Sequence, residues 1–519
     1  MSANKTIVLV NFPPFNRFDY IYSGTIYPAT GLMIIGSIYK EKGFEVQLID
    51  GALDKDYEER VLKSLSNGVL FVGFSLMTSQ LRMAHVLANK IKDQYPNVPI
   101  VFGGMHPTLY PEQVANEKYV DVVVVNEGAR AAVELLEYFV NKKALKDIRG
   151  IAYSDDKGQV HVNPPQEFDD IESIPHFDFS LLDLPRYLNA DNYLNRELDL
   201  APGEKIKLMP ILTGLGCCYR CNFCVNVILK RKYRHRSAES IVEEIKRLQK
   251  TYGANTFWFL DEDFFINRER LEKLVVLVKK ENLKFLARTW VRVSYFSNPN
   301  YKDCIANLES IGIRSLAMGA ESGSQKMLDF LCKGIKVEDI VAAVKSLSNT
   351  RIMPRLSFMI GLDTETKDDV MKTYKLCGKL MKINERTDIA GPYVYRYHPG
   401  SPMFNSLLKK HNITLPSAIE EWDSMLNDDG SLKVGAQKYC WPGFLKYQEA
   451  MNTYIILCCE VFRQSNLRNK KLIKIMRSFF IWRLMHCEHL YIIDYYFFKI
   501  LKGLRVFIKK VKKIKIKRA

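Results

Sequence analysis

Four cysteines lie close together in the segment TGLGCCYRCNFCVN of a 519-residue chain that has 11 cysteines in all. Three of them, Cys217, Cys221 and Cys224, have the spacing C-x3-C-x2-C and directly follow a β-like run. Thiols at this spacing could form a disulfide, bind zinc or hold an iron–sulfur cluster. The chemistry of this segment therefore depends on what the rest of the chain supplies.

A structural zinc site needs four ligands, and no Cys or His pair follows at suitable spacing, since His235 stands alone among basic residues. The N-terminal segment MSANKTIVLVNFPP lacks the basic region, apolar core and cleavage site of a signal peptide. We therefore expect a reducing cytoplasm, which disfavours a disulfide. A cubane cluster on three thiolates would leave one iron open to a small molecule.

The cysteine spacing resembles the signature of the radical S-adenosylmethionine enzymes. The resemblance implies that Cys217, Cys221 and Cys224 hold a [4Fe-4S] cluster whose fourth iron binds S-adenosylmethionine. One electron would then release methionine and a 5′-deoxyadenosyl radical, which abstracts a hydrogen atom from the substrate. Cys218 stands where the family often has proline, and we expect no role for it.

Further segments, in the same order along the chain, resemble the parts of this family that contact S-adenosylmethionine. The acidic segment FLDEDFF resembles the one that contacts the methionine amino group, and GAESGS resembles the one that faces the ribose and methionine. The segment FMIGLDTET resembles the one that flanks the adenine, with Asp363 where proline is more usual, and YHPGSPMF resembles the sixth-strand ending. The residues that the resemblance places against S-adenosylmethionine are Asp261, Glu262, Asp263, Gly319, Glu321, Ser322 and Gly361.

The elements that must position these residues can be read from the hydrophobic pattern. In the first 140 or so residues, five runs rich in Val and Ile (TIVLVNF, FEVQLID, VLFVGFSL, VPIVFGG and VDVVVVN) alternate with helical segments, among them TLYPEQVANE. Such runs are typical of a parallel sheet covered on both faces. We predict an α/β protein whose residues 1–145 form a flavodoxin-like doubly wound domain, which binds ligands at the carboxyl ends of its strands.

The remaining chain divides into three parts. Residues 146–206 read as a linker with a small hairpin, GIAYSDDKGQVHVNPP. Six repeats of strand then helix over 207–430 predict a partial (β/α)6 barrel with its chemistry at the strand ends. Residues 431–519 read as a helical C-terminal region.

A doubly wound domain ahead of such a barrel resembles the cobalamin-binding subfamily of the radical enzymes, through YPATGL, GFSLMTS, GGMHPTLYPE and NEGA. Small residues at strand ends let a flat corrin approach the backbone. The motif D-x-H-x-x-G that supplies a histidine to cobalt is missing, so the resemblance implies base-off cobalamin without a histidine ligand. We expect His106 to be a loop residue near the corrin. The residues expected to bind cobalamin are Ser75, Thr78, Gly103, Gly104, Glu127 and Gly128.

This domain has two alternative interpretations. It could be a degenerate scaffold without a cofactor, because a fold alone does not establish a function. The methylthiotransferases also have an N-terminal α/β domain, but theirs holds a second cluster on three cysteines, and this chain has no cysteine before Cys217. The cysteines outside the cluster segment show no cluster spacing and are assigned to packing: Cys304, Cys332, Cys377, Cys440, Cys458, Cys459 and Cys487.

The basic character of the chain lies in its C-terminal part. The formal net charge is +17, and from Ser465 onward 16 lysines and arginines stand against two acidic residues. Residues 493–513 place apolar side chains on one helical face and cationic ones on the other, which is the pattern of a helix in a membrane interface. The apolar face could instead dock on the barrel, or the end could be a disordered basic tail. We expect no nucleic-acid contact, because no recognised module accompanies the charge.

These features together predict a radical enzyme that methylates an unactivated carbon with the help of cobalamin. Radical cyclisation, rearrangement or oxidation without methyl transfer, as in the anaerobic cyclase of bacteriochlorophyll synthesis, is the alternative, and a non-enzymatic cobalamin sensor is the weaker one. We expect a small-molecule or lipid substrate and a low-potential electron donor such as flavodoxin or ferredoxin. The expected location is the cytoplasm, with peripheral contact at the inner face of the membrane through the tail.

Overall fold

The computed structural model describes two compact units. The first comprises Met1–Val291, Asp303–Ser315 and Arg396–Ala436, and the second comprises Arg292–Lys302, Leu316–Tyr395 and Gln437–Ala519. The described residues are 6–13, 27–140, 143–188, 198, 205–426, 433, 441–461, 470–487 and 495–496.

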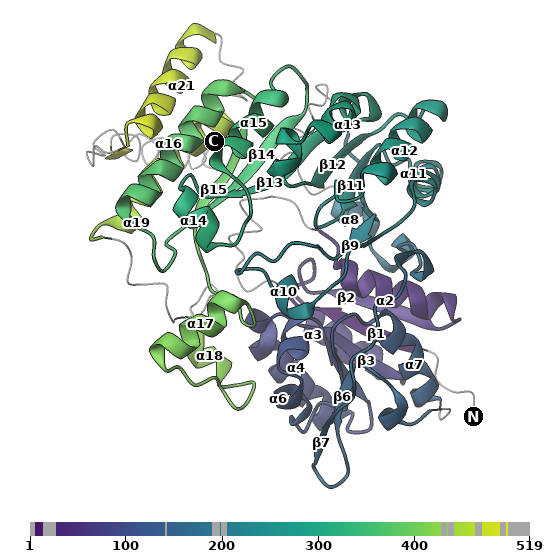
Figure 1. Ribbon diagram of the computed structural model, residues 1–519. Coiled ribbons are helices and arrows are strands. Elements are labelled where there is room, and N and C mark those ends of the chain that lie inside the picture. Colours follow the sequence, from purple (N-terminus) through teal and green to yellow (C-terminus); the bar gives the residue numbers. More distant parts are fainter. Residues whose placement is uncertain are drawn as a thin grey trace, which may run out of the picture. The chain divides into compact units, whose positions relative to one another are not determined.

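A seven-stranded sheet forms the N-terminal part of the first unit (Figure 1), with the order β2-β1-β3-β4-β5-β6-β7. Its first five strands pair in parallel. The order 2-1-3-4-5 is that of flavodoxin-like proteins, which confirms the predicted fold of this part. These strands are β1 (Thr6–Asn11), β2 (Glu45–Asp50), β3 (Phe71–Ser75), β4 (Ile100–Gly103) and β5 (Val122–Val124).

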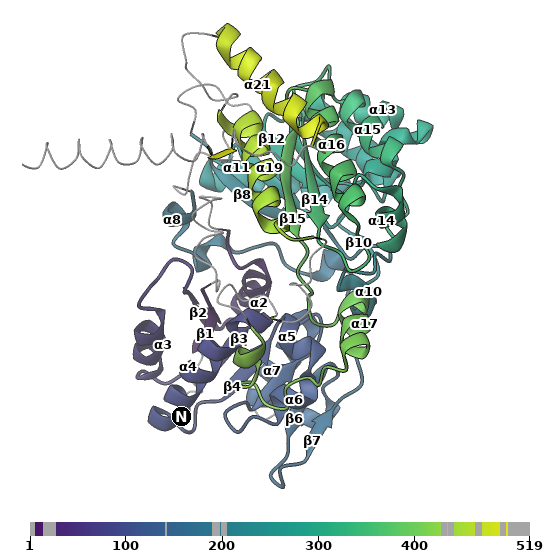
Figure 2. The same ribbon diagram turned by 90° about the vertical axis from the view of Figure 1, so that its left-hand side faces the viewer.

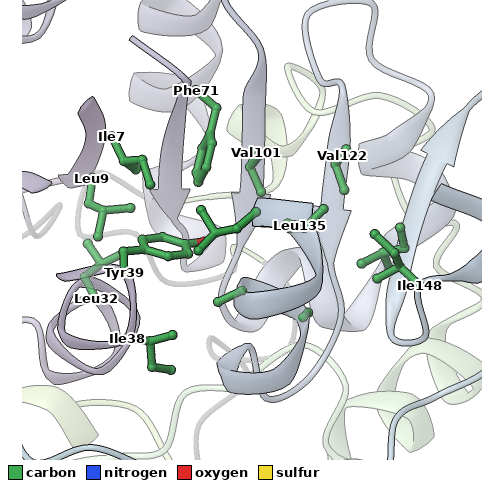
Figure 3. Close-up of a cluster of buried hydrophobic side chains, with 14 residues drawn as sticks. Ile7, Leu9, Leu32, Ile38, Tyr39, Phe71, Val101, Val122, Leu135 and Ile148 are labelled. Carbon is green, nitrogen blue, oxygen red and sulfur yellow. The ribbon is translucent and has the colours of Figure 1, made fainter. Parts of the chain in front are cut away.

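Helices cover both faces of these strands. Successive side chains of a strand point to opposite faces. Phe71 of β3 therefore packs against Tyr39 of α2, whereas Phe74 packs between Phe12 and Phe102 on the other face. Figure 3 shows the buried cluster that contains Phe71 and Tyr39, to which α7 contributes Leu135. The helices are α2 (Thr30–Glu41), α3 (Tyr57–Leu65), α4 (Leu81–Gln94) and α7 (Ala129–Phe139).

The helix expected over TLYPEQVANE is divided into two short helices, α5 (Met105–Leu109) and α6 (Pro111–Ala115). The prediction of one helix was wrong because Pro111 has no backbone N–H and cannot continue α5. At the first position of a new helix that missing N–H costs nothing.

The predicted hairpin is confirmed as β6 (Ile151–Ser154) and β7 (Val160–Val162), which pair antiparallel. Asp155 stabilises the turn by accepting hydrogen bonds from the backbone N–H groups of Lys157 and Gln159, each at 2.9 Å. The hairpin is more than part of a linker, because β6 also pairs with β5 and so extends the main sheet. After it come η3 (Ile171–Ser173), η4 (Phe179–Leu181) and α8 (Leu184–Leu188).

The second sheet has six strands in the order β15-β14-β13-β12-β11-β8, which confirms the six predicted repeats. The pairs β8–β11, β11–β12 and β14–β15 are parallel. Its strands are β8 (Leu208–Leu212), β11 (Thr256–Leu260), β12 (Leu286–Trp290), β13 (Ile313–Glu321), β14 (Met353–Ile360) and β15 (Asp388–Val394). Among its helices are α11 (Ala238–Tyr252), α12 (Arg268–Lys280), α14 (Gln325–Phe330), α15 (Val337–Ser346), α16 (Lys367–Ile383) and α17 (Pro402–His411).

The C-terminal part is helical where it is described, with α18 (Trp422–Met425), α19 (Phe444–Ile456) and α21 (Lys470–Met485). In the second unit α21 packs closely on α16, since a Cβ added at Gly378 would lie 2.9 Å from Met485 Cγ. Of the predicted amphipathic segment 493–513, all but Tyr495 and Tyr496 lie outside the described residues. Within the described part of the chain, no helix has both the length and the apolar character that crossing a membrane requires. The domain boundaries placed after residues 145, 206 and 430 stay predictions.

Most cysteines that were assigned to packing are buried in the structure. The prediction was wrong for Cys332, which is exposed because it lies in a turn with φ +49° directly after α14. Cys440 lies outside the described residues. The buried ones are Cys304, Cys377, Cys458, Cys459 and Cys487.

The core of the first sheet yields a stability prediction. Leu135 is fully buried in the cluster of Figure 3, and Leu135→Ala should lower the free energy of unfolding by about 2–5 kcal/mol, because it removes buried methyl groups and leaves a cavity. Urea unfolding followed by circular dichroism measures this loss. Val276→Ala is the control, because Val276 on α12 is 62% exposed. Equal effects of the two substitutions would contradict the described packing.

Candidate functional site

The cysteine loop lies between two short strands, β9 (Gly214–Leu215) and β10 (Arg234–His235), which pair antiparallel and close it at its base. Gly216 begins the loop with φ +81°, and a Cβ there would collide with the carbonyl oxygen of Lys232. Only glycine fits this position without strain. The strand pair and the glycine thus fix where the loop leaves the barrel.

None of the three cysteines of the C-x3-C-x2-C motif is in a disulfide bond. Cys221 is buried, and Cys217 and Cys224 are half-buried. The N–H of Cys224 donates to the carbonyl of Cys221 at 3.0 Å, which makes this part of the loop a turn. Burial raises the pKa of the Cys217 thiol to about 11, so binding a metal here would have to release that proton. Cys218 is exposed.

Asp261, at the carboxyl end of β11, is buried and held by two partners. Its Oδ2 accepts a hydrogen bond from the Thr213 hydroxyl at 2.7 Å and lies 3.3 Å from Arg270 Nη1. Arg270 is itself fixed, because it donates to the carbonyls of Thr213 and Phe264. Burial raises the pKa of Asp261, and Arg270 partly offsets that effect. The other oxygen, Oδ1, finds no hydrogen-bond donor among the described residues.

The two acidic residues that follow lie in different surroundings. Glu262 lines the same cavity as Asp261, and desolvation of its carboxyl raises its pKa. The side chain of Asp263 is buried, accepts a hydrogen bond from the N–H of Phe265 at 3.3 Å, and its charge contributes to the raised pKa of Cys217. The structure therefore brings the acidic segment and the cysteine loop together, as predicted from the sequence order.

A cavity of about 650 Å³ connects these carboxylates to the ends of β3, β4 and β5, and every residue that lines it belongs to the first unit. Asp261 and Glu262 lie on one side of it. The residues predicted to bind cobalamin that line it are Ser75, Gly103, Gly104, Glu127 and Gly128.

Thr78 and His106 lie outside the lining of this cavity. The Thr78 hydroxyl lies 3.1 Å from His106 Nδ1, so this hydroxyl is engaged, whereas the buried His106 Nε2 has no hydrogen-bond partner among the described residues. His106 lies in α5 and not in a loop, because the residues after Gly104 turn directly into a helix. It is fully buried against Trp422 and Tyr110, and this burial lowers its pKa to about 3.

The cavity has an apolar arm and a polar mouth. The arm runs between helices α2 and α7 and the sheet, and its walls are small or apolar: Leu32, Ile35, Tyr39, Phe71, Gly73, Val101, Ala129 and Ala132. The mouth carries the polar side chains of Thr108, Asn126 and Arg231. This division suits a ligand that has both an aromatic end and a rim of amides.

Two observations test whether cobalamin fits this cavity. Gly104 has φ +96°, and a Cβ there would lie 2.6 Å from Leu76 N, so the strand end presents bare backbone. Asn126 has φ +72° and is held by its N–H bond to Thr108 Oγ1 at 2.8 Å, while its buried Oδ1 finds no donor among the described residues. An unpaired acceptor suits the amides of a corrin. None of the described residues that line the cavity is a histidine.

Sequence reasoning did not find the arginines that hold Glu127. Arg234 donates to both carboxylate oxygens, at 2.9 Å and 2.5 Å, and Arg231 Nε lies 3.6 Å from Oε1. Arg234 also donates to the carbonyl of Asp169 at 2.8 Å. The basic run KRKYRHR directly after the cysteine loop was the available signal, but its partner lies more than 100 positions earlier.

In the second unit, Glu321 ends β13 in a left-handed conformation with φ +63°, which is rare outside glycine. Its carboxylate is buried and lies 2.7 Å from Lys333 Nζ. A Cβ added at Gly319 would meet both of these side chains. Backbone strain of this kind is found preferentially at functional sites.

The other two predicted residues of the second unit are engaged by neighbouring elements. Ser322 is fully buried, and its hydroxyl lies 3.2 Å from Thr373 Oγ1 of α16. Gly361, with φ +80°, follows β14, and its N–H donates to Glu365 Oε2 at 2.5 Å. Leu362 donates to the same oxygen at 3.2 Å, so Glu365 fixes the start of the segment GLDTET.

Comparison with known families gives two matches along the chain. The family model of the radical SAM superfamily matches residues 211–377, and that of the B12 binding domain matches residues 19–136. An uncharacterized methyltransferase of Pyrococcus horikoshii is 29% identical over 392 residues, which cover 74% of this chain and 81% of the relative. The anaerobic magnesium-protoporphyrin IX monomethyl ester cyclase of Rubrivivax gelatinosus is 23% identical over 468 residues, with 86% and 80% covered.

Two solved structures have a similar fold. The cobalamin-dependent S-adenosylmethionine radical enzyme OxsB, with aqua-cobalamin and S-adenosylmethionine bound, has a TM-score of 0.71 at 18% identity, covering 93% of this chain and 72% of that one. The radical S-adenosylmethionine methyltransferase TsrM from Kitasatospora setae has a TM-score of 0.64 at 16% identity, with 88% and 89% covered. At these identities the likeness establishes the fold.

Glu365 yields a prediction about pH. Burial raises the pKa of its carboxyl to about 7, against about 4.3 in an unfolded chain. Between these values the folded protein keeps a proton that the unfolded chain has lost, so the contribution of Glu365 to stability falls as the pH rises. The glutamine of Glu365→Gln is neutral at every pH. Between pH 5 and pH 8 the thermal midpoint of the wild type should therefore fall relative to that of Glu365→Gln. Parallel midpoint curves for the two proteins would contradict this.

Proposed function

The chain belongs to the radical S-adenosylmethionine enzymes that carry a cobalamin-binding domain, and we propose that it transfers a methyl group to an unactivated carbon of its substrate. Its cofactors are accordingly a [4Fe-4S] cluster, S-adenosylmethionine and cobalamin. When bound, they supply a 5′-deoxyadenosyl radical that takes a hydrogen atom from the substrate, and a cobalt-carried methyl group that replaces it.

We propose Cys217, Cys221 and Cys224 as the cluster ligands. Their C-x3-C-x2-C spacing and the turn at Cys221 and Cys224 support this assignment. The half-buried position of two of them keeps the loop accessible to a ligand on one side while the buried Cys221 anchors the other. Cys218, which is exposed, is left without a ligand role in the proposal.

The residues proposed for S-adenosylmethionine are the ones that the sequence indicated. In the first unit, Asp261 and Glu262 offer carboxylate oxygens at the cavity, and Asp263 lies beside Cys217. Arg270 keeps Asp261 in place, so that Oδ1 is free to accept from an amino group. In the second unit the candidates stay as predicted from the sequence: Gly319, Glu321, Ser322 and Gly361.

Cobalamin would be held by the strand ends of the N-terminal sheet. Ser75, Gly103, Gly104 and Gly128 line the cavity there, and the apolar arm behind them would take the nucleotide end of the molecule. Glu127 belongs to the same wall, but its carboxylate is paired with Arg234. Its proposed role is therefore to orient Arg231 and Arg234 at the mouth. Thr78 is a weaker candidate, since its hydroxyl is engaged by His106.

One observation carries the proposal more than any other. Within one compact unit, a single cavity is lined both by the strand ends of the B12-type domain and by the carboxylates of the barrel that follow the cysteine loop. A methyl transfer assisted by both cofactors requires their sites to open into shared space. The lining of one cavity by Asp261 and Glu262 together with the ends of the B12-type strands supports such an arrangement. The similarity to a methyltransferase over most of the chain agrees with the proposal.

A second candidate is radical cyclisation or oxidation without methyl transfer. The similarity to the anaerobic cyclase, which covers 86% of this chain, favours it. The two candidates use the same cofactors and differ in whether a second S-adenosylmethionine is demethylated. In either case we propose a small-molecule or lipid substrate and a low-potential donor such as flavodoxin or ferredoxin as the source of the electron.

The proposal predicts the products of protein that is purified without oxygen, reconstituted with iron, sulfide and cobalamin, and reduced in the presence of S-adenosylmethionine. The wild type should form 5′-deoxyadenosine, and Cys221→Ala should form none above background, because two thiolates do not retain the cluster. Mass spectrometry measures the product. Cys218→Ala, in the same loop, is the control and should match the wild type. Equal products from wild type and Cys221→Ala would refute the cluster assignment.

The same assay separates the two candidate functions. Methyl transfer predicts S-adenosylhomocysteine in addition to 5′-deoxyadenosine, and only when cobalamin is present. Cyclisation or oxidation predicts 5′-deoxyadenosine alone. The absence of S-adenosylhomocysteine with a full complement of cobalamin and with turnover of the substrate would overturn the proposed methyl transfer in favour of the second candidate.

The cobalamin site is tested by substitution of Gly104. Gly104→Ala places a Cβ against Leu76, which displaces the wall of the cavity, and should weaken cobalamin binding by about tenfold or more, about 1.4 kcal/mol. The absorbance of cobalamin retained after gel filtration measures this, with the iron content as a check on the barrel. Gly43→Ala is the matched control, because Gly43 also has positive φ (+82°) but nothing within 4 Å. Equal retention by both variants would contradict the assignment.

A further inference from the structure

Helix α21, drawn in yellow in Figure 2, has two unlike apolar sides. One side is buried in the second unit through Phe480, Ile481 and Leu484. The other side exposes large apolar side chains: Ile475 is 66% exposed, Phe479 43% and Trp482 49%. Their spacing of four and then three residues places them in one stripe along the helix.

The exposed stripe is ordered by contacts among its own rings. Phe479 and Trp482 stack with their centroids 6.3 Å apart, and Trp482 stacks on His486 at 4.9 Å. Other exposed large hydrophobic residues among those described are dispersed over different elements, such as Val276 on α12 and Leu445 on α19. A set of apolar side chains gathered on one helix face indicates an interaction surface.

The charged side chains of α21 itself are all positive. Lys471 and Lys474 are exposed beside it, and the sequence of α21 contains no acidic residue. Arg477 and Arg483 of the same helix are turned to the protein: the first donates to the carbonyl of Met381, and the second lies over the ring of Tyr454. The two lysines therefore define the charge of the exposed side.

We propose that this side of α21 docks on an anionic lipid surface. An indole and a phenyl ring beside lysines is the chemistry of the headgroup boundary, where the rings enter the apolar layer and the ammonium groups meet lipid phosphates. A second copy of this chain fits less well, because α21 carries no acidic side chain that could pair with the lysines of the same helix in a partner. The wider sequence agrees with an anionic partner, since 16 lysines and arginines stand against two acidic residues from Ser465 onward.

The test uses the full-length protein and flotation with vesicles. The wild type should float with vesicles of equal parts phosphatidylglycerol and phosphatidylcholine, and at least about tenfold less with phosphatidylcholine alone. The triple variant Ile475→Ser, Phe479→Ser, Trp482→Ser should lose about tenfold or more of the bound fraction. The control is Val276→Ser, Leu445→Ser, which removes exposed apolar side chains elsewhere (62% and 56% exposed) and should bind like the wild type.

Three outcomes would overturn the proposal. If the triple variant floats like the wild type, the binding belongs to another part of the basic C-terminal region. If the wild type floats equally with both kinds of vesicle, the lysines do not select anionic lipid. If the triple variant changes only the sedimentation coefficient of the protein without lipid, the face is an interface between copies of the chain.

A second measurement locates the helix itself. Vesicles with brominated acyl chains should quench the tryptophan fluorescence of the wild type, and Trp482→Phe, which keeps an aromatic ring in the stripe, should still bind but lose that quenching. Binding of the wild type without quenching would mean that Trp482 stays out of the lipid, for instance because another segment of the chain covers it, and would likewise overturn the proposal.

Discussion

The carboxylate of Glu127, held between Arg234 and Arg231, is the interaction on which the proposed site depends. It joins the residues after β5 of the first sheet to the segment that closes the cysteine loop, and Arg234 extends the connection to Asp169. The three side chains are largely shielded from water, with 13–20% of each exposed. Removing Glu127 would leave two partly buried arginines without their shared counter-charge, so the two sequence regions are held together by more than apolar contact.

A second constraint is that the cavity and the core of the first sheet share side chains. Leu32, Tyr39, Phe71 and Val101 belong to the buried cluster and also line the apolar arm of the cavity. A ligand in this arm would pack against side chains of the core itself. Binding and stability are therefore coupled, because a ligand that binds only the folded state raises the free energy of unfolding.

The candidate site also depends on glycines, whose missing side chains leave room for neighbouring groups. Gly104, Gly214 and Gly216 each lie where a Cβ would meet Leu76, Asp261 or Lys232. The buried Asp261 can approach β9 only because Gly214 leaves that space. In the second unit, Gly319 does the same for Glu321 and Lys333. On the exposed side of α21, by contrast, bulky rings point outward, and Phe479 and Trp482 are 43% and 49% exposed.

The sequence by itself determined the cysteine motif, the alternation of strands and helices that is typical of a flavodoxin-like domain, and the six β/α repeats, because these depend on local spacing and hydrophobic period. The order of the strands in the sheet comes from the structure. Only the tertiary structure decided that β6 pairs with β5, that Thr78 is taken up by His106, and that Arg270 fixes Asp261. It also decided that Glu127 is held by Arg231 and Arg234. The residues in each of these contacts are not related by a helical or strand repeat, so the sequence pattern does not show that they pair. Their pairing depends on where the packed sheets and helices place the strand ends.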